Sequence, residues 1–286
     1  MHQSVMARES LEYLAVRPDG TYLDATAGLG GHTALIAERL TTGLVIANDR
    51  DAQSLEMART NTGAWADRIR YHQGVFGDLA ETVKWAGCGK LDGLLADLGV
   101  SRYQLTAPER GFSILADGPL DMRMDQSRGM TAADLVNHNA EKELADLIFQ
   151  LGEERRARRI ARALVRARPI RSTRHLADVV ERAVPRTGRL HPATRTFMAL
   201  RMAVNDETRE LERLLSVAPD LLQTGGRMVV ISFMSTDDRM VKHRFRALAQ
   251  EHRAQILTKR PLQPTDEEMA RNAASRSAKL RAIEMS

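Results

Sequence analysis

The chain has 286 residues, of which 43% are hydrophobic and 28% are charged, so it can bury a sizeable core and is not disordered throughout. Its single cysteine, Cys88, excludes an internal disulfide and a cysteine-based zinc site. No apolar run approaches the roughly 20 residues that cross a bilayer, and residues 1–9 lack the apolar segment of a signal peptide. We therefore expect a cytoplasmic protein without a membrane partner.

The positive charge is unevenly distributed. The net charge is +5, yet the stretch from Glu153 to Arg174 alone contains nine arginines against two glutamates. Guanidinium groups match phosphate oxygens, and clustered positive charge releases counterions when it binds a polyanion. We interpret this stretch as a phosphate-binding face. The alternative is a helix face that is merely solvated.

The first hundred residues alternate between strand and helix patterns. Short apolar runs predict strands, and amphipathic segments between them predict helices. Strands alternating with helices indicate a parallel sheet covered on both faces. The predicted strands are 21–23, 44–47, 69–72 and 91–96, and the predicted helices are 32–40 and 54–60.

This alternation stops after about residue 106 and resumes after residue 207. Between these points we predict an ordered loop over 110–125 and only helices thereafter. A strand over 228–233, a helix over 238–250 and a last edge strand over 278–283 follow. The predicted fold class is α/β, with a Rossmann-like domain of residues 1–106 and 208–286 interrupted by an all-helical insert of residues 107–207. The helices expected in the insert are 132–137, 141–151, 153–167, 173–184 and 193–217.

Acidic residues end three of the predicted strands, and a glycine turn follows the first. These acids are Asp24, Asp49 and Asp97, and the turn contains Gly28-Leu29-Gly30-Gly31. Ligands of an open parallel sheet bind beyond the carboxyl ends of its strands. Glycine lets a ligand approach the backbone closely, and the following helix presents free N–H groups.

Two cofactor classes use such a turn. A dinucleotide favours G-x-G-x-x-G, but position 33 is threonine, and Asp24 would repel a pyrophosphate. S-adenosylmethionine instead carries a sulfonium and an ammonium group, which suit nearby carboxylates. Asp49 can accept hydrogen bonds from ribose hydroxyls in either case. We therefore favour S-adenosylmethionine over a nicotinamide cofactor or a purely structural turn, and we expect no metal site.

Several longer motifs carry a resemblance that covers nearly the whole chain. They are Asp24-Ala25-Thr26 with Gly28 and Gly30-Gly31-His32; Asp49-Arg50-Asp51; Asp97-Leu98-Gly99-Val100-Ser101 with Gln104; Arg110-Gly111-Phe112-Ser113; Gly118-Pro119-Leu120-Asp121-Met122-Arg123-Met124-Asp125; Gly152-Glu153-Glu154-Arg155; His191-Pro192-Ala193-Thr194-Arg195-Thr196-Phe197; and Arg276-Ser277-Ala278-Lys279-Leu280-Arg281. With these motifs the chain resembles the bacterial 16S ribosomal-RNA cytosine-N4 methyltransferases.

The resemblance implies a fold, an activity and a cofactor pocket. The fold is a class I methyltransferase sheet with a helical insert that recognises the substrate. The activity is transfer of a methyl group from S-adenosylmethionine to N4 of a cytidine in the decoding region of 16S ribosomal RNA, within the small ribosomal subunit. The sequence leaves the oligomeric state open, with a homodimer as one alternative. The cofactor residues carried over are Gly30, Gly31, His32, Asp49, Phe76, Asp97 and Gln104.

Asp97 is the predicted catalytic residue. The exocyclic amine of cytosine needs to be held in line with the methyl group, and it needs an acceptor for its N–H groups. Asp97 at a strand end is the best-placed candidate. For the RNA we expect an ion-pair lattice of Asp121, Arg123 and Asp125 around the target base. Phosphate contacts are expected from Arg195, Arg201 and Lys242.

The chain departs from the family pattern at three motifs. Met234 replaces a histidine of the family, Ala273-Ala274 replaces Pro-Arg, and Ser101-Arg102-Tyr103-Gln104 stands where the family commonly has Ser-Ser-Pro-Gln. A thioether cannot donate the hydrogen bond of an imidazole, so we expect these departures to bear on substrate positioning and turnover and to leave the cofactor residues intact. Two alternatives follow: an RNA- and cofactor-binding ribosome-assembly factor with little catalysis, or a divergent methyltransferase with another RNA target.

Overall fold

The computed structural model describes residues 4–186, 188 and 190–286. The chain forms two compact units. The sheet unit comprises residues Met1–Val100 and Thr208–Ser286, and the helical unit comprises Ser101–Glu207. The sequence pattern predicts the first boundary at residue 106, after the short helix that the structure assigns to the helical unit.

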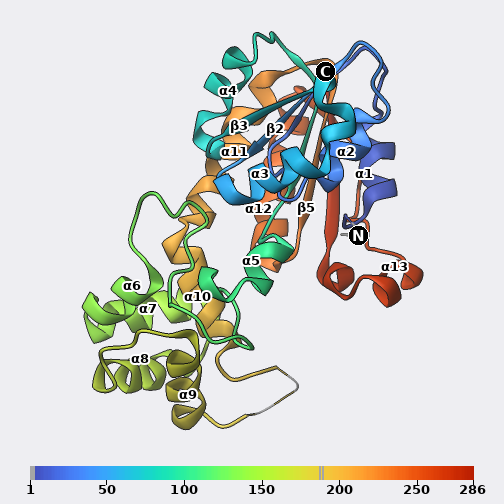
Figure 1. The fold of residues 1–286 in the computed structure, drawn as a ribbon. Helices are drawn as coiled ribbons and strands as arrows, with labels where there is room; N and C mark the ends of the chain where they lie inside the picture. The colour runs from blue at the N-terminus through green and yellow to red at the C-terminus, as the bar shows by residue number, and fades with distance from the viewer. Residues whose placement is uncertain (1–3, 187, 189) are drawn as a thin grey trace. The chain divides into compact units, whose positions relative to one another are not determined.

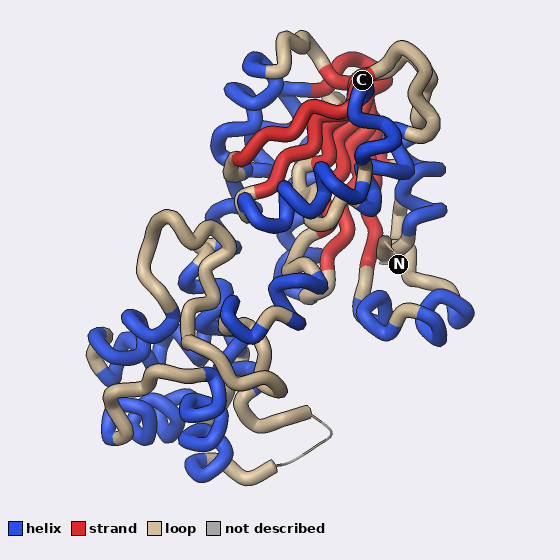
Figure 2. Tube along the Cα trace, viewed as in Figure 1, coloured by secondary structure: helices blue, strands red, loops and turns tan. Residues whose placement is uncertain are grey.

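The strands of the sheet unit form one sheet (Figure 2), and their order across it is β3-β2-β1-β4-β5-β7-β6. The strands from β3 to β5 run parallel, and β7 runs antiparallel to both β5 and β6. The strand order reverses between β1 and β4, which is where a ligand is expected in a sheet of this kind. The strand bounds are β1 Thr21–Asp24, β2 Leu44–Asp49, β3 Ile69–Gln73, β4 Leu91–Asp97, β5 Leu222–Ser232, β6 Ala254–Ile256 and β7 Lys279–Met285.

Helices cover both faces of the sheet (Figure 1). Leu14 of α1, Ile36 of α2 and Leu55 of α3 pack on one face, and helices α4, α11 and α12 pack on the other. The strands are short runs that are buried on both faces, as expected for a parallel sheet. The helix bounds are α1 Ala7–Leu14, α2 Gly31–Ala37, α3 Ala52–Asn61, η1 Gly63–Arg68, η2 Phe76–Asp78, α4 Leu79–Trp85, α11 Glu207–Leu221, α12 Ser235–Gln250, α13 Asp266–Arg271 and η4 Ala273–Ser277.

The helical unit contains helices and one isolated bridge, between Pro119 and Ser172, among its described residues. Its long loop is ordered by Arg110, which is fully buried and donates hydrogen bonds to the carbonyl oxygens of Arg123 and Met124. A Cβ at Gly111 would collide with the carbonyl oxygen of Pro119, so the turn requires glycine. The bounds are α5 Arg102–Thr106, η3 Pro108–Arg110, α6 Ala132–His138, α7 Glu141–Gly152, α8 Ala157–Arg166, α9 Thr173–Ala183 and α10 Thr194–Val204.

Three predicted elements are wrong in detail. The helix predicted over 193–217 is two helices, because Asp206 adopts a left-handed φ of 50° between α10 and α11. The helix predicted from residue 153 begins at Ala157, because Glu153 has a φ of 50° and ends α7. Strand β7 is not an edge strand, because β6 pairs on its outer side.

Candidate cofactor and catalytic site

The turn after β1 is organised around Asp24. One oxygen of its buried carboxylate accepts a hydrogen bond from the Thr33 hydroxyl at 2.7 Å, and the other accepts one from the Thr26 amide at 3.2 Å. The threonine that breaks the dinucleotide pattern is therefore a partner of this acid. Gly30 has a φ of 86°, and a Cβ there would lie 2.8 Å from Cγ2 of Thr62. The turn is thus closely packed and needs glycine.

Asp49 at the end of β2 fixes the neighbouring loops. Its Oδ2 accepts a hydrogen bond from the Gly28 amide at 2.8 Å, and its Oδ1 accepts one from the Asp51 amide at 2.9 Å. Asp51 in turn caps α3 by accepting hydrogen bonds from the amides of Gln53 and Ser54. Each carboxylate oxygen of Asp49 retains acceptor capacity for a further donor, such as a ribose hydroxyl.

Asp97 at the end of β4 faces the same turn. Its amide donates to the hydroxyl of Thr26 at 2.7 Å, and its Oδ2 lies 3.8 Å from Nδ1 of His32. His32 is held from its other side, because its Nε2 donates to the carbonyl oxygen of Val5 at 3.0 Å. Oδ1 of Asp97 is buried and has no hydrogen-bond partner among the described residues. A buried acceptor of this kind is costly unless a ligand supplies the donor.

The carboxyl groups of this site are weaker acids than usual, because each has a raised pKa. Burial raises the pKa of Asp97 to about 8, and the nearby carboxylates of Asp24 and Glu268 add to this shift. Burial likewise raises the pKa of Asp49 to about 6. The pKa of Asp24 is raised by burial against the opposing effect of His32. Crowded, desolvated carboxylates of this kind favour a positively charged ligand over an anionic one.

Phe76 follows β3 and is positioned by a contact with helix α11. Its ring packs partly buried against the core, and its amide donates to Oε2 of Glu210 at 2.9 Å. The loop before it is tied to the end of β2, since the Gly74 amide donates to the carbonyl oxygen of Asp49 at 3.1 Å. Phe76 and Asp49 therefore lie on adjoining loops, as the predicted pocket requires.

Gln104 belongs to the helical unit, in helix α5. It forms a reciprocal capping box with Ser101, in which its side-chain Oε1 accepts from the Ser101 amide at 2.8 Å. Its side chain is buried. The local role of Gln104 is therefore to begin α5, and its contact with a cofactor stays a prediction.

The predicted ion-pair lattice in the loop exists only in part. Arg123 binds Asp121 with two hydrogen bonds, of 2.8 and 2.9 Å. This arginine outweighs the effect of burial and lowers the pKa of Asp121. Asp125 instead pairs with Arg128 at 2.8 Å and accepts from Ser127. The lattice is thus two separate pairs, because the turn after Asp125 brings Arg128 back to it.

The predicted phosphate contacts differ in their availability. Arg195 is exposed at the start of α10, where it donates to the carbonyl oxygen of Glu153 at 3.0 Å. Arg201 is held in a bidentate ion pair with Glu207, with both bonds at 2.8 Å. Lys242 lies half-buried on α12 of the sheet unit. Arg195 is therefore the most accessible of the three, and RNA contact stays a prediction for all of them.

Sequence reasoning missed the supporting residues of the site. Val5, Glu210 and Glu268 act through a backbone carbonyl or through contacts between distant segments, and no local pattern marks them. Glu268 of α13 also accepts from the Met6 amide at 2.7 Å, which joins α13 to the N-terminal segment. Figure 1 shows these two segments side by side. Glu268 is also close enough to Asp97 to help raise the pKa of that carboxyl.

One motif of the resemblance has a structural role. Arg281 on β7 forms a bidentate ion pair with Asp238 at the start of α12, with bonds of 2.6 and 3.1 Å. Met234, which departs from the family pattern, directly precedes α12 as its N-terminal cap and makes no side-chain capping bond.

Within residues 4–186, 188 and 190–286, no group of three or more His, Cys, Asp or Glu could hold a metal ion. The helices of this described part are each too short or too polar to cross a membrane.

Comparison with known proteins gives a consistent result. The model of the MraW methylase family matches residues 1–286. The Ribosomal RNA small subunit methyltransferase H of Solibacter usitatus is 73% identical over 285 residues, covering 100% of both chains. The protein of that name from Acidobacterium capsulatum is 50% identical and covers 99% of this chain and 98% of its own. A solved rRNA methylase from Streptococcus thermophilus covers 100% of this chain and 98% of its own, with a TM-score of 0.47 and 12% identity. The chain belongs to the MraW methylase family.

Proposed function

We propose that this protein transfers a methyl group from S-adenosylmethionine to the exocyclic N4 of a cytidine in the decoding region of 16S ribosomal RNA. The observation that carries this proposal is Asp97: a buried carboxylate at a strand end, beside the glycine turn, with one oxygen unpaired among the described residues. The 73% identity to a small-subunit ribosomal RNA methyltransferase supports the same activity.

The donor set fits S-adenosylmethionine. When bound, this cofactor supplies an electrophilic methyl group on a sulfonium and carries an ammonium at its amino-acid end. The carboxylates of Asp24, Asp97 and Glu268 repel one another in the free protein, and a cationic ligand relieves that repulsion. Asp49 offers acceptor capacity for ribose hydroxyls, and Phe76 offers an apolar ring beside the adenine.

Asp97 orients the cytosine amine and takes up its proton. The amine lone pair is delocalised into the ring, so catalysis depends on holding the nitrogen in line with the methyl group. Oδ1 of Asp97 has the acceptor capacity that an N–H of the amine requires. His32 lies beside this carboxylate, with its Nδ1 3.8 Å from Oδ2 and its Nε2 donating to the carbonyl oxygen of Val5.

The helical unit supplies the RNA contact in this proposal. Along α8 and the turn before it, Arg155, Arg156, Arg158, Arg159, Arg162 and Arg166 are exposed. Among the described residues, this face has one acidic ion-pair partner within 4 Å, Glu141 beside Arg162. An arginine face of this density suits a phosphate backbone, and recognition of the folded small subunit follows from the shape-dependence of RNA binding.

Methyl transfer onto small ribosomal subunits tests the proposal. Subunits from cells that lack this gene would be incubated with labelled S-adenosylmethionine, and the product nucleosides mapped by mass spectrometry. We expect N4-methylcytidine at one position of 16S ribosomal RNA. Binding of cofactor and RNA without transfer would support an assembly factor instead. Transfer to another RNA would support a divergent target.

A further inference from the structure

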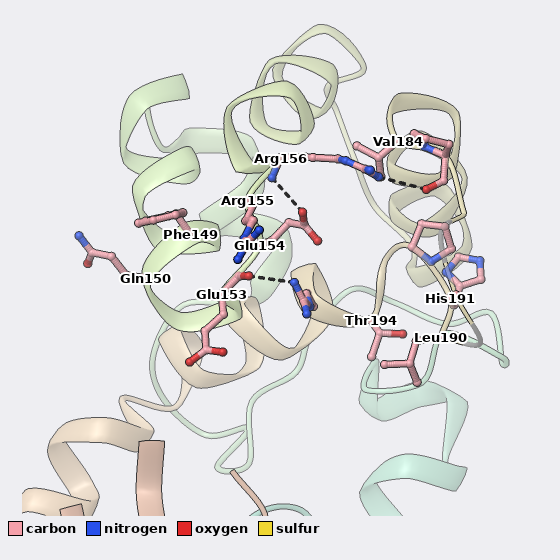
Figure 3. Close-up of a pocket in the computed structure, with 14 residues that line it drawn as sticks. Phe149, Gln150, Glu153, Glu154, Arg155, Arg156, Val184, Leu190, His191 and Thr194 are labelled. Atoms are coloured by element: carbon pink, nitrogen blue, oxygen red, sulfur yellow. Dashed lines mark hydrogen bonds between the residues drawn. The ribbon is translucent and has the colours of Figure 1, made fainter. Parts of the chain in front are cut away.

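A cavity lies within the helical unit, and none of the predicted cofactor residues line it. It has a volume of about 900 Å³ and is formed by the end of α7, the turn into α8 and the segment before α10 (Figure 3). This volume is in the range of ligand-binding pockets, which is about 300–1,000 Å³. Every residue that lines it belongs to the helical unit.

Packing between helices holds the walls of this cavity in place. A Cβ at Gly152 would lie 2.6 Å from the carbonyl oxygen of Arg195, so the end of α7 and the start of α10 are in close contact. Arg195 donates to the carbonyl oxygen of Glu153 at 3.0 Å across this contact. Arg156 spans to the far wall, where it donates to the carbonyl oxygen of Pro185 at 3.2 Å. These contacts join the end of α7, the turn into α8 and Pro185.

The lining combines exposed apolar side chains with three arginines and two glutamates, Glu153 and Glu154. Phe149 is 58% exposed and Leu190 is 68% exposed, although both are large apolar residues. Arg155 is exposed and forms no ion pair or side-chain hydrogen bond among the described residues. Figure 3 shows Phe149 and Arg155 on adjoining walls of the cavity. An exposed ring beside one guanidinium group without a partner among the described residues marks a surface with a partner.

The chemistry favours one class of partner. Unpaired nucleobases stack on aromatic side chains and arginine planes, and their phosphates bind guanidinium groups. The arginines continue from the cavity along α8, so a strand that enters the cavity can follow a basic track. Unpaired bases of single-stranded RNA can reach an exposed ring such as Phe149, whereas a duplex keeps its bases stacked on one another. Single-stranded RNA is therefore the class of ligand that this lining suits.

We propose that this cavity holds an unpaired nucleotide of the RNA substrate, with its base on the Phe149 ring and its phosphates on Arg155 and Arg156. This inference rests on the proposed function only for the identity of the RNA. It assigns the cavity to a nucleotide other than the one that is methylated, because the cavity contains none of the cofactor residues Gly30, Asp49 or Asp97.

Binding of a short oligonucleotide tests this proposal. The probe is a fluorescently labelled hexaribonucleotide, titrated with the full-length protein and followed by anisotropy. We expect Phe149→Ala to weaken binding about tenfold, the size of one lost base–aromatic stack. Phe149→Trp should bind at least as tightly as the wild type. Arg155→Ala should weaken binding several-fold.

A base-free oligomer with the same phosphate backbone separates stacking from charge. Phe149→Ala should leave its binding unchanged, whereas Arg155→Ala should weaken it. The matched control is Leu115→Ala, an exposed apolar residue of the same unit that does not line the cavity. Circular dichroism would confirm that each variant is folded.

Three results would overturn the proposal: no binding of the hexaribonucleotide by the wild type, equal binding by Phe149→Ala, or preferential binding of an acidic peptide at the cavity. Titration with S-adenosylmethionine in the same variants keeps the two proposals apart, since Phe149→Ala should leave cofactor affinity unchanged. Absence of methyl transfer by the wild type, with the stacking pattern intact, would contradict the proposed function and leave the cavity assigned.

Discussion

At the scale of the single residue, the buried carboxylate of Asp97 lowers the stability of the free protein as the pH rises. Its carboxylate is held at the end of β4 with a raised pKa of about 8, whereas an unfolded chain would ionise it near pH 4. As the pH rises through this interval, the unfolded state releases its proton and the folded state does not. The carboxylate therefore destabilises the free protein increasingly up to about pH 8.

Replacing Asp97 with asparagine should separate these two effects. Asp97→Asn keeps the shape and removes the charge, so we expect methyl transfer to fall at least about 100-fold, the size of a lost acid–base group. At pH 8 the variant should resist urea better than the wild type. Activity assays measure the rate of methyl transfer, and urea unfolding at pH 5 and pH 8 measures the stability of the two proteins. Near-normal turnover at saturating cofactor and RNA would remove Asp97 from the mechanism.

Cofactor affinity should depend on pH through the same carboxylates. Binding of a cation requires Asp97 to be ionised, so affinity should rise about tenfold per pH unit up to about pH 8. Below about pH 6 the protonation of Asp49 should make the dependence steeper. Calorimetric titration with S-adenosylmethionine from pH 5 to pH 9 would measure how the affinity for the cofactor depends on pH. In Asp97→Asn the rise between pH 6 and pH 8 should disappear; its persistence would assign that rise to another group.

At the scale of the element, the turn before α2 depends on one glycine. Gly30→Ala forces a left-handed φ of 86° on a residue with a side chain and places Cβ 2.8 Å from Thr62. We expect a loss of about 1–3 kcal/mol in the free energy of unfolding. Gly63→Ala is the matched control, because a Cβ there meets nothing within 4 Å. Equal urea midpoints for the two variants would show that the turn accommodates a side chain at position 30 without loss of stability.

The junction of β7 and α12 depends on an ion pair. The side chains of Arg281 and Asp238 are only 9% and 14% exposed. Arg281→Ala leaves a carboxylate nearly buried without its partner, so we expect a loss of about 3 kcal/mol. Arg271→Ala, in a pair that is 67% and 70% exposed, should change stability by less than about 1 kcal/mol. Thermal or urea unfolding would compare the free energies of unfolding of the two variants. A similarly small decrease for both would show that water screens the Arg281 pair as it screens the exposed pair.

At the scale of the whole molecule, positive charge is concentrated on one helix of the helical unit. If about five arginines of the α8 face neutralise phosphates, RNA affinity should fall about 100-fold between about 50 mM and about 200 mM salt. Replacing Arg158, Arg159 and Arg162 together with glutamine should reduce the salt slope by about two to three. Filter binding at several salt concentrations measures the slope. A flat dependence, or an unchanged slope in the triple variant, would exclude α8 as the phosphate contact.

The sequence predicted the parts of the site that lie at the ends of local elements. Asp24, Asp49 and Asp97 end strands, and strands are recognisable as short apolar runs, so the three acids could be placed at one edge of a parallel sheet. The family resemblance added Phe76 and Gln104, whose contacts with a cofactor stay predictions. The helical insert was predictable because its stretch lacks apolar strand patterns and is rich in helical ones.

Only the tertiary structure decided the residues that support this site and the exact course of the chain. Glu210 and Glu268 reach the site from segments distant in the sequence, and Val5 acts through its carbonyl, which every residue type possesses. The break at Asp206 and the inner position of β7 arise from packing: the Asn205 side chain bonds Met122 and Met124 of the loop, and β6 needs β7 as its partner. Local patterns fix periodicity and charge, whereas contacts between distant segments are fixed by how the folded chain fills space.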